Sequence, residues 1–179
     1  MKNEKKLIHT RNISCRGYRL SDNLYEIEGV LTDTKPFQTS SFDRNKIEPN
    51  EPIHEMVIRI KIDINFVIVD AESISKKTPY LNCSDVNKDF KKLIGLQIKT
   101  GFTQNVKNLI GGKVGCTHLV EMMRSIATTA FQALYPDRDK LNLNSNESNR
   151  PKLLNSCYSW SESSRMIQEK FPNFYRRNV

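Results

Sequence analysis

The sequence predicts an α+β domain, with an antiparallel sheet of about four strands and helices packed on one face. Two observations support this class. Residues 7–75 alternate apolar and polar side chains, the pattern of strands with one buried and one solvated face. Residues 84–135 change to a helical pattern, in which apolar side chains recur every three or four positions. Strands followed by helices are typical of α+β folds.

Four strands are expected from the alternation. Residues 7–19 and 24–31 form two of them, joined by the turn residues at 21–23. A polar loop with three prolines covers residues 36–53. After it, a hairpin leads from the clearest strand to a last strand that ends near Ser75. The clearest strand carries its apolar side chains on one face: Met56, Ile58, Ile60, Ile62 and Ile64.

Three helices are expected after the sheet, over residues 84–93, 103–110 and 117–135. Pro136 should end the third helix, because proline has no N–H group to donate to the preceding turn. The methionines of this helix are interpreted as core side chains and not as part of a cofactor site.

The composition indicates one domain followed by an extension. Residues 1–136 are predicted to form a single α+β domain, and residues 137–179 a polar, flexible linker with a C-terminal amphipathic segment. The net charge of +8 is spread along the chain without a block of like charges. A nucleic-acid partner is therefore compatible with the sequence but not indicated by it, and a protein partner is equally compatible.

The cysteine content predicts a cytoplasmic protein with reduced thiols. No apolar signal segment follows the polar start of the chain, and no stretch reaches the roughly 18 apolar residues of a membrane span. In a reducing compartment, cysteines and histidines more often bind metals or catalyse reactions than form disulfides.

Four residues are candidate metal ligands: His54 in I-H-E-M, Cys83 in P-Y-L-N-C-S, and Cys116 and His118 in G-C-T-H-L. Two thiols and two imidazoles suit a four-coordinate zinc ion, and thiolates also hold iron–sulfur clusters. The sequence therefore predicts a metal site with zinc or an iron–sulfur cluster, although no pair has the C-x-x-C spacing of common zinc motifs. His9 is either a spare ligand or a surface residue, and the second interpretation is favoured. Cys15 and Cys157 are interpreted as structural or incidental.

A glycine-rich segment, residues 111–115, precedes Cys116 and allows a tight turn into a helix start, where the helix dipole favours a thiolate. The same residues permit an enzyme. Cys116 or Cys83 would be the nucleophile, His118 or His54 its base, and the loop amides an anion hole. Whether the protein is an enzyme stays open, and a basic interaction or nucleic-acid-binding module is a third alternative.

Residues 7–135 resemble a bacterial family catalogued as a domain of unknown function. The resemblance is carried by the motifs I-H-T-R, Y-E-I-E-G-V-L-T-D-T-K, I-H-E-M-V-I-R-I-K-I-D, P-Y-L-N-C, L-I-G, G-C-T-H-L and T-A-F-Q. It implies no activity.

The order of elements also resembles the iron–sulfur scaffold fold of the NifU and IscU type. By position, the resemblance implies His54 in place of the family's Asp, Cys83 as the middle ligand, Cys116 as the late ligand and His118 as an added imidazole. It implies a scaffold-like role in iron–sulfur handling. The chain departs from that family because Asp becomes His, adjacent His-Cys becomes Cys-x-His, and the loop lengths differ, which leaves a two-cysteine, two-histidine zinc site as the simpler expectation.

Overall fold

The computed structural model describes residues 4–20, 23–146 and 149–177, and the chain divides into two compact units, Met1–Ala133 and Leu134–Val179. The turn expected at Ser21 and Asp22 lies outside the described residues. Asn23, which follows them, has a positive φ of 59°, as a turn residue often does.

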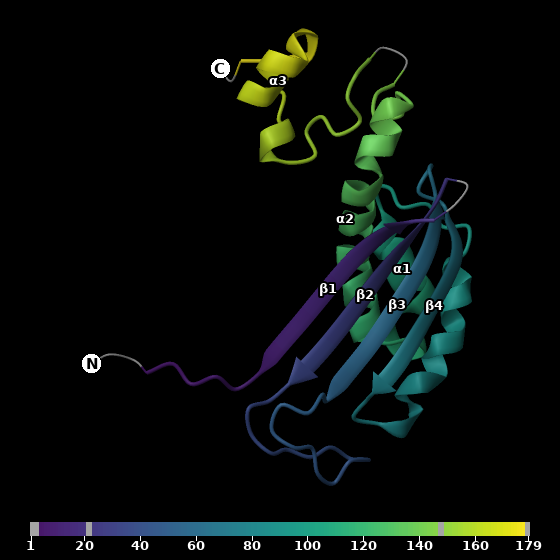
Figure 1. Cartoon of the computed structure of the whole chain (residues 1–179), viewed down its shortest axis with the longest axis vertical. Helices are drawn as coiled ribbons and strands as arrows, with labels where there is room; N and C mark the ends of the chain where they lie inside the picture. The colour runs from purple at the N-terminus through teal and green to yellow at the C-terminus, as the bar shows by residue number, and fades with distance from the viewer. Residues whose placement is uncertain (1–3, 21–22, 147–148, 178–179) are drawn as a thin grey trace. The chain divides into compact units, whose positions relative to one another are not determined.

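The first unit contains one four-stranded antiparallel sheet in the order β1-β2-β3-β4. Its strands are β1 (Thr10–Arg19), β2 (Leu24–Thr34), β3 (His54–Asp63) and β4 (Ile68–Lys77). Figure 1 shows them side by side, with the helices of this unit behind them. The α+β class and the antiparallel sheet are therefore confirmed, whereas a similarity to the NifU and IscU fold is not.

Helices follow the sheet in sequence, as predicted, but two differ from expectation. They are η1 (Leu81–Leu93), α1 (Phe102–Ile110), η2 (Gly112–Val114) and α2 (Thr117–Lys140). The first is a 3-10 helix that begins earlier than expected, so Cys83 lies within it and not in a loop. The prediction that Pro136 ends the long helix was wrong: Pro136 lies inside α2, which continues to Lys140. A proline costs the helix one hydrogen bond, which the short remaining segment tolerates.

The core lies between the sheet and these helices. Burying each large apolar side chain contributes about 1.5–3 kcal/mol. Gly29 in β2 allows close packing here, because a Cβ atom on it would lie 2.8 Å from Ile126 of α2. The methionines of α2 are almost fully buried, which confirms their structural role. The principal core side chains are Ile27, Leu31, Met56, Ile58, Ile60, Ile62, Phe90, Leu93, Val106, Ile110, Leu119, Met122, Met123 and Ile126.

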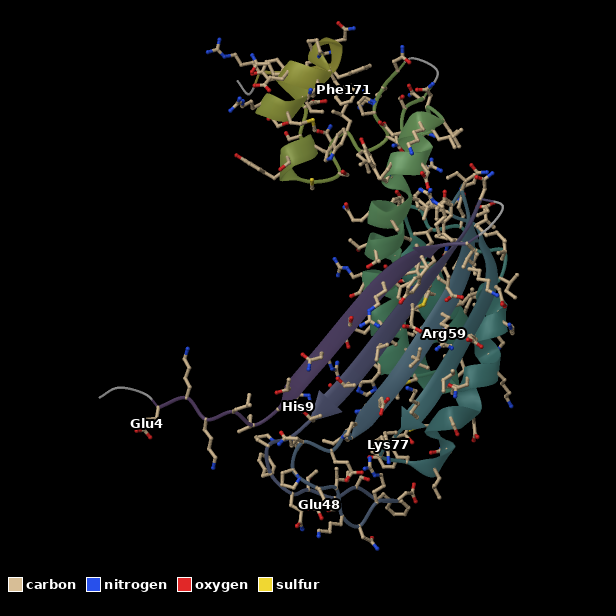
Figure 2. The ribbon with its side chains drawn as sticks, in the orientation of Figure 1. Glu4, His9, Glu48, Arg59, Lys77 and Phe171 are labelled. Atoms are coloured by element: carbon tan, nitrogen blue, oxygen red, sulfur yellow. The ribbon has the colours of Figure 1, made fainter. Side chains whose placement is uncertain are left out.

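The opposite face of the sheet is charged. Arg59 of β3 contacts Glu28 of β2 at 2.9 Å and Glu72 of β4 at 3.0 Å. Figure 2 shows the Arg59 side chain on the near face of the sheet, away from the helices. Arg59 and Lys61 are partly exposed, as the predicted alternation requires, whereas Val57, which the alternation places on the same face, is buried and Ile64 lies beyond the end of β3.

The second unit continues α2 into hydrogen-bonded turns and short helices: η3 (Tyr158–Trp160), α3 (Arg165–Lys170) and η4 (Pro172–Phe174). The Ser164 side chain caps α3 by accepting a hydrogen bond from the Ile167 amide at 3.3 Å. Ile167 is fully buried, and the rings of Trp160 and Phe171 lie 5.9 Å apart. These contacts form a small apolar centre within this unit.

None of the helices in the described part of the chain has both the length and the apolar character needed to cross a bilayer.

Candidate metal centre

The buried face of the sheet ends in a row of polar side chains. Arg11 of β1 lies directly opposite Asp33 of β2, and Asp33 lies opposite His54 of β3. Directly opposite residues of an antiparallel sheet project from the same face, with Cβ atoms about 4.5–5.5 Å apart. The strand register therefore brings together three residues that are far apart in the sequence.

Asp33 occupies the last position of the buried stripe of β2, which also contains Ile27, Gly29 and Leu31. Only 1% of Asp33 is exposed. A carboxylate at such a position requires charged or hydrogen-bonding partners, because an isolated buried charge is strongly unfavourable.

The start of α2 supplies the other side of the site through Cys116, His118 and Glu121. His118 and Glu121 are three residues apart and so share a helix face. Gly115 makes this geometry attainable, because a Cβ atom on it would lie 1.7 Å from the carbonyl oxygen of Ile110. Only a residue without a Cβ atom fits at this position, which supports the predicted role of the glycine-rich segment as a tight turn into the helix.

Asp33 is the centre of the cluster. Arg11 forms a two-pronged contact with it, at 2.8 Å from Nε to Oδ1 and 2.8 Å from Nη2 to Oδ2. His54 Nδ1 lies 3.0 Å from Oδ2, His9 Nε2 lies 3.3 Å from Oδ1, and His118 Nε2 lies 3.7 Å from Oδ2. Figure 2 shows His9 beside the end of β2. All three histidines of the chain therefore converge on one carboxylate.

Arg11 holds the Asp33 carboxylate in its ionised form. Burial raises the pKa of Asp33, but the hydrogen bond and charge of Arg11, together with the charges of His54 and His118, bring it below its usual value of 3.8. Arg11 is itself shared, since its Nη1 donates to Glu121 at 2.7 Å. The result is an ionised carboxylate held by a fixed cation.

The imidazole of His54 is biased toward its neutral form. Burial lowers the pKa of His54 below 6.5, and a positive charge on His118 lowers it further, against the opposing effect of Asp33. The rings of His54 and His118 lie 4.0 Å apart between centroids. A neutral imidazole is the form that binds metals and accepts protons.

Asp33, His54 and His118 form a group that can hold a metal ion. Each offers one ligand atom, and the three atoms lie within 4.8 Å of one another. Donor atoms bound to a tetrahedral zinc ion at about 2.0–2.1 Å lie about 3.3 Å apart. The distances of 3.0 and 3.7 Å from Asp33 Oδ2 to the two imidazoles lie on either side of that value.

Cys116 lies on the far side of His118 from this group, with its Sγ atom 3.8 Å from His118 Nδ1. Burial raises the pKa of the Cys116 thiol, but the hydrogen bond with His118 and the backbone amides of Leu119 and His118 lower it, and the net effect is below its usual value of 9.0. Thiols at helix N-termini are often activated in this way.

Cys83 of η1 has a different environment. Burial raises the pKa of its thiol, the hydrogen bond with the backbone of Tyr80 lowers it, and negative charges on Cys116 and Asp43 raise it again, with a net increase. Neither cysteine belongs to the group of Asp33, His54 and His118. The structure thus brings the two predicted histidines together, while the full ligand set of His54, Cys83, Cys116 and His118 stays a prediction.

The site predicted from the sequence did not include three residues that belong to the observed cluster: Arg11, Asp33 and Glu121. A signal for Asp33 exists in the sequence, because it falls on the same alternating stripe as Ile27 and Leu31. A charged residue on an apolar stripe marks a functional or paired position. The interpretation of His9 as a surface residue was incomplete, since its side chain is 40% exposed yet contacts Asp33.

The site lies within a segment that matches a known family model. The model, described as "Protein of unknown function (DUF2889)", matches residues 9–132 and so includes every residue from His9 to Glu121. No curated protein and no solved structure matches the chain. The match supports the predicted membership of an uncharacterised family, but neither the individual motifs nor a relationship to NifU and IscU. The chain belongs to the DUF2889 family of proteins of unknown function.

Proposed function

We propose that this protein binds a single divalent metal ion, with zinc preferred, through Asp33, His54 and His118. The observation that carries the proposal is the proximity of the three ligand atoms, which all lie within 4.8 Å of one another. Two imidazoles and a carboxylate are a ligand set used for zinc and for non-haem iron. The ionised state of Asp33 and the neutral bias of His54 are the forms that a metal requires.

A cation at this site would lie close to the positive charge of Arg11. A carboxylate has about four lone-pair positions, so Asp33 can accept from Arg11 and still bind an ion. The positive charge of Arg11 is offset by Glu121, which contacts it at 2.7 Å. The surroundings of the three ligands are therefore close to neutral.

Three protein ligands leave one coordination position for water, a substrate or a fourth ligand. Cys116 is a candidate fourth ligand, but His118 Nδ1 faces Cys116 while His118 Nε2 faces Asp33. One imidazole cannot give both nitrogens to the same ion, so Cys116 joins the group only after a rotamer change. A role in iron–sulfur handling requires thiolates from Cys83 and Cys116 and is less well supported than a single ion.

Metal analysis of protein purified without an affinity tag tests the proposal. We expect about one zinc ion per chain, and competition with a chromophoric chelator should show a loss of affinity of at least about tenfold in His54→Ala and His118→Ala. His9→Ala is the comparison: His9 contacts Asp33 but lies outside the three-residue group, so its removal should weaken binding less than the removal of either ligand. A protein that neither contains nor takes up zinc, iron, cobalt or manganese contradicts the proposal.

The cysteine variants then identify the ligand set. Binding that survives in both Cys83→Ala and Cys116→Ala indicates the Asp-His-His group alone. Loss of binding in both variants indicates the ligand set predicted from the sequence. Cys157→Ala controls for the loss of an exposed thiol.

A second candidate function is an enzyme with Cys116 as its nucleophile. The observation that favours it is the order thiol, imidazole, carboxylate, with 3.8 Å from Cys116 to His118 and 3.7 Å from His118 to Asp33. In such an arrangement the imidazole takes the thiol proton and the carboxylate orients the imidazole. We expect iodoacetamide to alkylate Cys116 faster than Cys157 at pH 7 in the metal-free protein, and His118→Ala to slow the reaction. Equal rates at the two cysteines would exclude an activated Cys116.

A further inference from the structure

β1 is an edge strand of ten residues, and its outer side has no strand partner within residues 4–20, 23–146 and 149–177. Gly17, the eighth residue of the strand, is exposed, although a Cβ atom on it would lie 2.7 Å from Ala133 of α2. An open edge of this length presents unpaired N–H and C=O groups that can accept another strand. Figure 1 shows β1 at one side of the sheet, with β2 on its inner side.

The hairpin register indicates which residues of β1 face the open edge. The Leu20 amide donates to the Leu24 carbonyl at 2.8 Å, and the β1–β2 pairing continues from there without a register shift. Hydrogen-bonded and non-hydrogen-bonded pairs alternate along an antiparallel ladder. Ile13, Cys15 and Gly17 therefore direct their backbone groups outward.

A groove of about 450 Å³ runs beside this edge on the helix-covered side of the sheet. Its α2 wall offers hydroxyl groups and one guanidinium, and its β1 wall is apolar. An added strand would direct every second side chain into this groove. The lining residues are Ile13, Cys15, Arg124, Ser125, Thr128 and Thr129.

The positive charge along the edge indicates which kind of strand it can bind. β1 contains no acidic residue; of its arginines, Arg11 is already paired with Asp33 and Glu121, whereas Arg16 is mostly exposed. On the groove side, Arg124 forms no ion pair with any described residue, and on the other face Arg16 is only loosely paired with Glu28, at 4.0 Å. Antiparallel pairing of β1 with a second copy of itself would bring arginines close to arginines, which is unfavourable. An acidic strand complements both faces.

We infer that the open edge of β1 binds an extended acidic segment of a partner protein, which adds to the sheet as a fifth strand and directs carboxylates toward Arg124 and Arg16. Backbone hydrogen bonds supply affinity in this mode of recognition, and alternate side chains supply specificity. The inference does not depend on metal binding, because neither Arg124 nor Arg16 contributes to the metal site.

Fluorescence anisotropy with a labelled eight-residue peptide of valine and glutamate tests the inference. Its repeat, Val-Glu-Glu-Val, places glutamates on both faces of the added strand. We expect saturable binding that weakens as salt is added, and no binding of the corresponding valine–lysine peptide. Arg124→Glu should weaken binding at least tenfold. Lys107→Glu, an equal charge change at an exposed position of α1, should change it less than threefold.

Backbone methylation of the peptide separates strand addition from simple charge attraction. Methylating alternate amides blocks the donors on one edge of the peptide without altering its charge. Binding should be lost when one set of alternate amides is methylated and retained when the other set is methylated. Equal binding of both methylated peptides, or no binding of the unmodified peptide, would overturn the inference. Sedimentation that shows a dimer formed through β1 would also overturn it, since a second copy would then occupy the edge.

Discussion

The Nδ1 atom of His54 lies 3.0 Å from the Oδ2 atom of Asp33, and the two residues are directly paired between β2 and β3. Both belong to regular strands and not to loops, so the sheet itself fixes their separation. The pairing holds the carboxylate and the imidazole in place before any ion is bound, which reduces the ordering that binding requires. His118 approaches from α2, whose position depends on the packing of Met122 over Gly29.

Asp33→Asn should abolish tight metal binding. The amide keeps the size of the side chain but lacks the negative charge, and the charge of Arg11 would then repel a cation. We expect the zinc affinity to fall by about 100-fold or more, measured by chelator competition at pH 7.5. Asp70→Asn removes a partly exposed carboxylate that pairs with Lys91 and serves as the control. Unchanged affinity in Asp33→Asn would exclude Asp33 as a ligand.

Stability of the metal-free protein should decrease below neutral pH because of His54. Its pKa is lowered in the folded state, so the unfolded chain binds a proton first as the pH falls through about 6.5. The folding contribution of His54 is fully present above that pH, and the slope below it is at most about 1.4 kcal/mol per pH unit for one proton. The free energy of unfolding in urea with EDTA, measured at pH 7.5 and 5.5, should differ less in His54→Gln than in the wild type.

Asp33 contributes to the pH dependence at a lower pH. Its pKa is also depressed in the folded state, so the stabilisation that it provides is fully present above its ordinary value of 3.8. That stabilisation is lost as the pH falls through the folded value.

The outcome that would contradict the His54 prediction is a loss of stability in His54→Gln between pH 7.5 and 5.5 that equals the wild-type loss. Another group would then titrate in this range.

The sheet was predictable because its signal is local. Period-two alternation in residues 56–64 needs no knowledge of the partner strand, and β3 follows it from Ile58 to Asp63, although Val57 is also buried and Ile64 lies beyond the strand. The number of strands, about four, followed from the same pattern, whereas their order in the sheet was not predicted. The end of β2 was less clear, because Thr32, Asp33 and Thr34 look like turn residues when read without their partners.

The candidate site was only half predictable because it depends on register. His54 and His118 were identifiable as uncommon residues at the ends of elements, but the pairing of Asp33 with both Arg11 and His54 arises only when three strands align. Cys83 and Cys116 were candidates only because thiols are common metal ligands. Their distance from the Asp33 carboxylate is a matter of tertiary packing that spacing in the sequence does not encode.

Two glycines of the segment before α2 should differ in their tolerance of alanine. At Gly115 a Cβ atom would lie 1.7 Å from the Ile110 carbonyl oxygen, so the backbone must move, and we expect a loss of about 2–4 kcal/mol in the free energy of unfolding. Gly112 has a φ of 60° with open space around its Cβ position, and alanine should cost only about 1 kcal/mol there. Equal losses in the two variants would contradict the steric explanation.

Arg11→Lys should destabilise the protein even though it preserves the charge. The guanidinium of Arg11 contacts both oxygens of the buried Asp33 and also reaches Glu121, and a lysine ammonium cannot reproduce that planar geometry. We expect a loss of about 1–3 kcal/mol in the free energy of unfolding, because one oxygen of Asp33 loses a charged partner. Arg16→Lys on the same strand is the matched control. Arg16 makes a single contact of 4.0 Å with Glu28 and is mostly exposed, so its replacement should change stability by less than about 0.5 kcal/mol. Equal effects at the two positions would mean that the charge of Arg11, and not its shape, holds Asp33.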